Sequence, residues 1–73
     1  MTRRYIYRDH VLYVKSFTSV NTVNYGVFFV DRKGYERILY ISGELSIRHT
    51  MEDAQRDLDA FAEKRGLREA KAA

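Results

Sequence analysis

The chain has 73 residues, no cysteine and a formal net charge of +3. This length suffices for one small domain with a marginal core, because a chain of this size buries only about 60% of its unfolded surface. The lack of cysteine excludes disulfides and thiolate metal sites, so oligomerisation is the remaining common way to stabilise such a small domain.

The charge is uneven along the chain. Residues 1–48 hold eight basic groups and four acids, a balance of +4, whereas residues 49–73 hold five basic groups and six acids, a balance of −1. Nine of the ten aromatic residues also lie in the first segment. Any anionic partner is therefore expected to meet the first part of the chain.

The N-terminal part predicts strands. Residues 5–7 and 11–14 are rich in strand-forming types and form either one bent strand or two short ones. Residues 16–24 are polar, and we expect them to connect to the next strand. Arg8, Asp9 and His10 interrupt the apolar run that a signal peptide needs, and no segment approaches the length of a membrane span. We expect a soluble, cytoplasmic protein without a membrane partner.

A β-hairpin is predicted from residue 25 to residue 41. Gly34 can adopt the positive φ that closes a three-residue loop with a bulge. This register pairs Phe28 with Ile38 and Val27 with Leu39. Both faces of the hairpin are then apolar: one carries Phe28, Val30, Ile38 and Tyr40, and the other carries Tyr25, Val27, Phe29, Leu39 and Ile41.

One helix is predicted after the hairpin. Thr50 is a suitable N-cap, and Gly66 can supply the left-handed residue that ends the helix. A single apolar stripe follows the helical period, formed by Met51, Ala54, Leu58, Phe61 and Ala62. We predict an α+β fold, in which an antiparallel sheet of three or four strands is followed by one C-terminal helix. Residues 1–67 form the single domain, and residues 68–73 form a frayed tail.

The helix can cover only one face of the hairpin, so the other face requires a partner. We expect a non-enzymatic protein-interaction module that forms a homodimer or binds another protein. The candidate interface comprises Tyr25, Val27, Phe29, Leu39 and Ile41.

Catalytic and metal sites have little support. His10 and His49 are explained by exposed positions near a bend and a helix start, and no serine or cysteine nucleophile motif accompanies them. Asp53 and Asp57 share a helix face, but the helix dipole and solvation explain such acids without a metal. We expect no cofactor and no metal.

The alternative is a small DNA- or RNA-binding domain that uses the basic and aromatic residues of the first segment. Cationic side chains neutralise phosphates, and tyrosines can stack on bases. The candidate contacts are Arg3, Arg4, Arg8, Arg32, Lys33 and Arg37.

The segment 50–67 reads Thr-Met-Glu-Asp-Ala-Gln-Arg-Asp-Leu-Asp-Ala-Phe-Ala-Glu-Lys-Arg-Gly-Leu. It resembles the closing helix of short, uncharacterised bacterial and prophage-type proteins, a resemblance that implies no activity. The layout of strands followed by a helix also resembles AP2-type domains and the arm-binding domains of phage integrases, which place a sheet on DNA. This resemblance assigns no DNA-binding residue to the chain. Because both faces of the hairpin are apolar, the hairpin does not fit a face that reads DNA, which should be polar.

Overall fold

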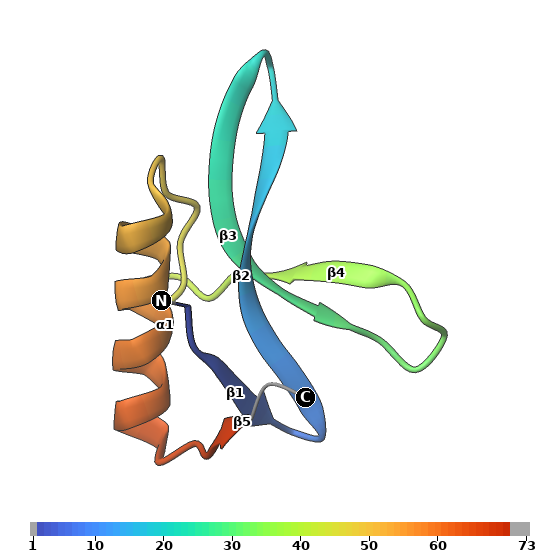
Figure 1. Ribbon diagram of the computed structural model, residues 1–73, viewed down its shortest axis with the longest axis vertical. Coiled ribbons are helices and arrows are strands. Elements are labelled where there is room, and N and C mark those ends of the chain that lie inside the picture. The colour runs from blue at the N-terminus through green and yellow to red at the C-terminus, as the bar shows by residue number, and fades with distance from the viewer. Residues whose placement is uncertain (1, 71–73) are drawn as a thin grey trace.

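The computed structural model describes residues 2–70 and contains one antiparallel sheet and one helix (Figure 1). The strands are β1 (Arg4–Tyr7), β2 (His10–Ser19), β3 (Thr22–Val30), β4 (Glu36–Leu39) and β5 (Glu69–Ala70), and the helix is α1 (Met51–Arg65). The strand order in the sheet is β4-β3-β2-β1-β5. The predicted α+β class is confirmed, with five strands instead of three or four.

Two tight turns join the first three strands. Arg8 and Asp9 turn β1 into β2 with φ values of 49° and 65°, and Val20 and Asn21 turn β2 into β3 with values of 50° and 59°. Positive φ at both central residues is the geometry that matches the twist of a two-residue hairpin. The polar segment 16–24 is therefore not a connection, as we expected, because its residues extend β2 and β3 up to this turn.

The predicted β3–β4 hairpin is confirmed in its register. Val27 pairs with Leu39 and Phe28 with Ile38. Gly34 has a φ of 90°, and the carbonyl oxygen of Asp31 accepts the N–H of Gly34 at 3.0 Å. The β2–β3 and β3–β4 hairpins project in different directions, so the sheet is strongly twisted (Figure 1).

Both predicted helix caps are present. The side chain of Thr50 accepts a hydrogen bond from the backbone N–H of Asp53 at 3.1 Å. Gly66 takes the left-handed conformation with a φ of 64°, and the N–H of Leu67 donates to the carbonyl of Ala62 at 2.9 Å. These bonds satisfy backbone groups that a helix leaves unpaired at its ends.

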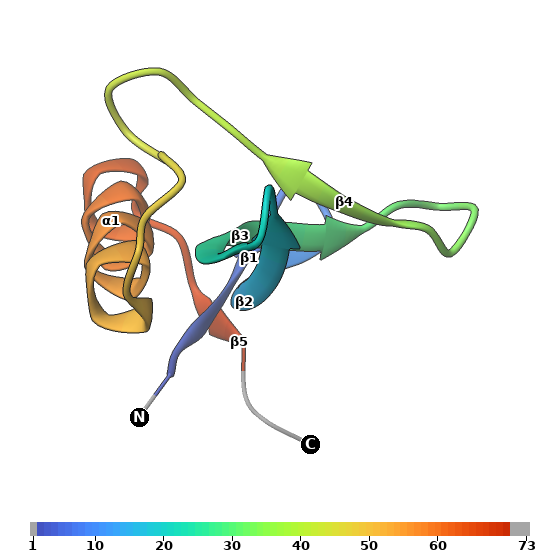
Figure 2. The same cartoon turned by 90° about the horizontal axis from the view of Figure 1, so that it is seen from above.

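The core lies between α1 and one face of the sheet (Figure 2). Its largest fully buried side chains are Leu12, Val27, Leu45, Leu58 and Phe61. The loop from β4 to α1 crosses this same side, where Leu45 packs into the core and Arg48 pairs with Tyr25 through two backbone hydrogen bonds.

The apolar stripe of the helix is buried, with two differences from the sequence pattern. Met51 is 40% exposed because it lies in the first turn, beside the exposed Thr2 at the start of the described chain. Gln55 is buried in its place and bonds to the N-terminal segment.

The predicted frayed tail is wrong for residues 68–70. The carbonyl of Arg68 accepts the N–H of Ile6 at 2.9 Å, and β5 pairs with β1. These backbone bonds hold the segment on the edge of the sheet. Residues 71–73 lie outside the described residues. Between residues 2 and 70, no helix combines the length and the apolar composition that crossing a membrane requires.

Candidate interface on the open sheet face

The helix covers the hairpin face that we expected to be open. Val27 is 2% exposed and lies in the core, and Phe29, Leu39 and Ile41 are partly buried against it. Tyr25 is half-buried, and its backbone is paired with the loop at Arg48. The prediction that Tyr25, Val27, Phe29, Leu39 and Ile41 form a free surface is therefore wrong, because α1 and its preceding loop pack on their side of the sheet.

The opposite face of the sheet is not covered by any helix or loop of the described chain, and we call it the open face. Cross-strand pairing places Tyr13, Phe28 and Ile38 in one row across β2, β3 and β4. Lys15 and Gly26 form the next row, followed by Phe17 and Asn24. Val11, Val30 and Glu36 lie on the same face, and Tyr40 follows by alternation since Ile41 turns to the core.

The apolar side chains of this face are in contact across the strands. The rings of Phe17 and Phe28 lie edge to face with centroids 5.7 Å apart. Gly26 lies beneath them, and a Cβ atom at this position would stand 3.0 Å from Cδ1 of Ile38 and 3.5 Å from Cε1 of Phe17. The missing side chain of Gly26 thus lets Phe17 and Ile38 approach each other over the sheet.

Much of this apolar surface is exposed. Val30 is 48% exposed, Ile38 40% and Tyr40 60%, and Val11 at the end of the face is also exposed. Large apolar side chains that lie together and remain accessible are the usual mark of an interaction surface, whereas isolated ones need no explanation.

A polar network lies beside this patch. Glu36 accepts hydrogen bonds from the Tyr13 hydroxyl and from Nζ of Lys15. Burial, followed by the hydrogen bond to Glu36, raises the pKa of Tyr13 to about 12, so the phenol is protonated at neutral pH. The bond from Lys15, followed by that from Tyr13, lowers the pKa of Glu36. Arg4 lies over the Tyr13 ring at 5.3 Å from its centroid.

The basic residues that we predicted to contact nucleic acid do not form one surface. Arg4 and Arg8 each lie over a tyrosine ring of the N-terminal strands, at 5.3 and 5.2 Å. Arg32 and Lys33 lie in the β3–β4 turn, which projects away from β1 (Figure 1). Arg37 forms an ion pair with Asp31 at 2.6 Å.

Arg3, the remaining basic candidate, precedes β1. The Tyr5 hydroxyl, followed by the charge of Asp59, raises the pKa of Arg3. Its surroundings therefore include the charge of an acid of the helix and not only solvent.

The histidines have ordinary surroundings. Nδ1 of His10 is 3.2 Å from the carbonyl oxygen of Val30, and its ring lies against Phe29 with centroids 5.0 Å apart. His49 is exposed just before the N-cap. Among residues 2–70 no three histidine or acidic side chains gather as a metal site would require.

Sequence reasoning missed the β2 contribution to the open face. Val11, Tyr13, Lys15 and Phe17 alternate with residues of the opposite face, and this period of two was the available signal. It was overlooked because the strand was expected to end at residue 14.

Comparisons of the chain with protein-family models, with curated proteins and with solved structures found no match.

Proposed function

We propose that this chain is a non-enzymatic interaction module that forms a homodimer through the open face of its sheet. The observation that carries the proposal is the contiguous apolar patch on the face opposite the helix, in which Val11, Val30, Ile38 and Tyr40 are exposed and Phe17 and Phe28 are half-buried. A second copy of the chain would supply the missing second layer, since one sheet face normally packs against another layer.

The size of the patch supports a second copy as the partner. Large side chains present roughly 150–250 Å² each when free, so these exposures leave on the order of 450 Å² of apolar surface per copy. Two faces together bury about 900 Å², and the polar rim brings the total near the roughly 1,000 Å² that a specific interface requires. An interface at this lower limit favours a weak dimer, with a dissociation constant on the order of 10 µM.

The charges of the open face also favour a protein partner. Arg4 and Lys15 are balanced in part by Glu36, which already accepts from Lys15. A face with both signs can pair with a copy of itself, because a two-fold axis can bring the Lys15 of one copy toward the Glu36 of the other. A phosphate-binding face would instead carry an excess of unpaired cations.

Sedimentation velocity at protein concentrations from about 5 to about 500 µM tests the proposal, because this range spans the expected dissociation constant. We expect the chain to convert from monomer to dimer over this range. Replacing Ile38 by Lys places a charge in the patch next to Lys15, and this variant should stay monomeric while retaining its helical circular dichroism.

The matched control is Val23→Lys, which makes a similar change in β3. Val23 is exposed and lies outside the patch, opposite Thr18 on the helix side of the sheet. The Val23→Lys variant should dimerise like the unmodified chain. A monomer at several hundred micromolar, or equal loss of association in both variants, would refute this interface.

A second candidate is nucleic-acid binding, which one observation favours. Among the residues that the structure describes, none of Arg3, Arg4, Arg8, Arg32 and Lys33 forms an ion pair with a carboxylate. These cations are available to phosphates, although they lie in separate places on the molecule. Titration with a random-sequence duplex at about 50 and 200 mM salt tests this candidate. Binding that weakens steeply with salt supports it, and no binding at the lower salt concentration eliminates it.

A further inference from the structure

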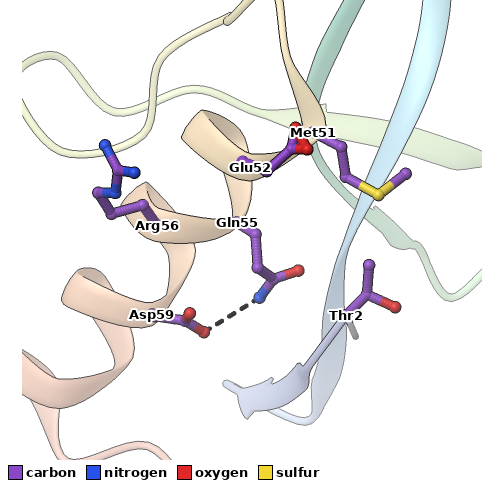
Figure 3. Close-up of a pocket in the computed structure, with 6 residues that line it drawn as sticks. All are labelled: Thr2, Met51, Glu52, Gln55, Arg56 and Asp59. Carbon is purple, nitrogen blue, oxygen red and sulfur yellow. Dashed lines mark hydrogen bonds between the residues drawn. The ribbon is translucent and has the colours of Figure 1, made fainter.

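A second feature of the molecule lies on the helix side, between the start of α1 and the residues that precede β1. It is a pocket of about 370 Å³, lined by Thr2, Met51, Glu52, Gln55, Arg56 and Asp59 (Figure 3). This volume falls within the range of small-ligand sites. The pocket shares no residue with the open face, so what it binds is independent of the proposed dimer.

Gln55 is the buried polar group of this pocket, with an exposed fraction of 9%. Its Nε2 donates to the backbone carbonyl of Arg3 at 3.1 Å and to Oδ1 of Asp59 at 3.0 Å. Both partners are acceptors, which fixes the orientation of the amide, because a reversed amide would face oxygen with oxygen. Gln55 thereby connects the helix to the N-terminal segment.

The carbonyl oxygen of Gln55 is left without a donor. Its Oε1 is buried and has no hydrogen-bond partner among residues 2–70. A buried acceptor without a partner is destabilising, and a donor from outside the chain, such as a water or a ligand, is one explanation for such a group in a native protein. Figure 3 shows that this oxygen points away from Asp59, toward the side of the pocket where Met51 and Thr2 lie.

The charged residues that line the pocket determine which charge is favourable for that donor. Glu52 lies at one end and Asp59 at the other, and Asp59 also accepts the Tyr5 hydroxyl at 2.7 Å. The one cation of the lining, Arg56, is partly neutralised by Asp53 at 3.4 Å. The acceptors in the lining therefore favour a ligand that brings both N–H donors and a positive charge.

A metal ion does not fit this arrangement. Glu52 and Asp59 are seven residues apart on the helix, which separates them by about 10 Å along its axis. One ion coordinates oxygens at only about 2–2.6 Å and cannot be held by both. An extended cation with an apolar body can lie between them, because Met51 provides an apolar wall.

We propose that this pocket binds an alkylammonium group, whose nitrogen donates to Oε1 of Gln55 while Glu52 and Asp59 supply the negative surroundings. The alkyl part lies against Met51, which is 40% exposed. The unbranched methionine side chain is flexible, so it can move to give the ammonium access to Oε1. Such a group occurs as the side chain of a lysine in a polypeptide and as one end of a free diamine.

The test is a titration of the full ¹⁵N-labelled chain with n-butylammonium chloride, followed by NMR. We expect saturable shifts of the side-chain amide of Gln55 and of the backbone amides of Met51 and Glu52. Glu52→Gln should weaken binding about tenfold, which is the effect of removing one charged hydrogen-bonding group. The exposed Glu63 lies on the same helix outside this pocket, so Glu63→Gln is the matched control and should bind like the unmodified chain.

Three results would overturn the proposal. The first is the absence of a saturable shift, which would leave a bound water as the only donor to Gln55. The second is an equal response to n-butanol, which has a similar alkyl chain without the charge. The third is equal binding by the Glu52 and Glu63 variants. If the site binds n-butylammonium, the same titration with N-acetyl-lysine amide and with 1,5-diaminopentane identifies the natural ligand. Tighter binding of N-acetyl-lysine amide indicates a lysine of a polypeptide, and tighter binding of 1,5-diaminopentane indicates a free diamine.

Discussion

Exchanging valine for threonine on the two faces of β3 tests which face the helix covers. Val27 is 2% exposed, and its cross-strand neighbours are Val14 and Leu39, which offer no hydrogen bond to a hydroxyl. Val27→Thr keeps the shape of the side chain but buries a hydroxyl, at a cost of about 1–3 kcal/mol. A chain of this length has a stability of roughly 4–11 kcal/mol, so the loss is a large fraction of the total.

The matched change is Val30→Thr, in the same strand and on the open face, where the side chain is 48% exposed. Threonine favours strands about as well as valine, so we expect a change within roughly 0.5 kcal/mol. The assay is urea unfolding followed by circular dichroism at low micromolar concentration, where dimerisation contributes little.

With a slope of about 1 kcal/mol per molar urea, the midpoint of Val27→Thr should fall by about 1–3 M and that of Val30→Thr should stay within roughly 0.5 M. Equal losses in the two variants, or a larger loss at Val30, would refute the assignment of the core to the Val27 face.

Three further predictions concern charge and caps. The bond from Arg37, followed by the backbone N–H of Tyr35, lowers the pKa of Asp31 below its ordinary value of 3.8. The Asp31 carboxylate therefore stabilises the fold at neutral pH, and this stabilisation is lost as the pH falls through the folded-state pKa of Asp31. In thermal unfolding, the difference in melting temperature between the unmodified chain and Asp31→Asn should shrink between pH 7 and 3. A constant difference would contradict this. Thr50→Ala removes the N-cap bond and should lower the free energy of unfolding by about 1 kcal/mol in urea, with no loss if the cap is dispensable. In Gly66→Ala the added Cβ atom would meet no other atom within 4 Å. The expected loss of about 1 kcal/mol in the free energy of unfolding therefore comes only from the left-handed backbone conformation. An unchanged urea midpoint would argue against that conformation.

The parts of the fold that sequence reasoning predicted correctly depend on neighbouring residues. Gly34 set the register of the β3–β4 hairpin, and Thr50 and Gly66 set the ends of α1. In each case the residue and the groups it bonds lie within a few positions along the chain. Such short-range chemistry can be recognised without knowledge of the tertiary structure.

The β2–β3 turn was missed because it has no glycine. Val20 and Asn21 both take positive φ, which asparagine tolerates but a β-branched residue adopts rarely. The long ladder on either side, from Tyr13–Phe28 to Ser19–Thr22, holds the turn in this conformation. The stabilising bonds belong to the whole hairpin and are not visible in the turn residues themselves.

The burial of Gln55 and the strand β5 depend on contacts far apart in sequence. Gln55 bonds to Arg3, 52 positions away, and Glu69 pairs with Tyr5 on β1. A polar residue on a helix predicts exposure, and a short polar tail predicts fraying, until the N-terminal strand is placed beside them. No residue near Gln55 or Glu69 along the chain indicates this placement, and so the pocket at Gln55 was not predicted.

Which face of the β3–β4 hairpin the helix covers depends on the β2–β3 turn, which was not predicted. Within β3 and β4 alone, both faces are apolar and nothing selects one. The β2–β3 register adds Leu12 and Val14 to the side of Val27, and β1 adds Tyr5 to the same side.

On the opposite side, the same strands place Arg4 beside Tyr13 and then Lys15 in β2. A helix packed there would bury two cations, which is far more costly than leaving part of an apolar patch exposed. The helix therefore covers the face on which β1, β2 and β3 carry no lysine, arginine or acid. The face that keeps Lys15 and Glu36 beside Phe28 and Ile38 is the one left open.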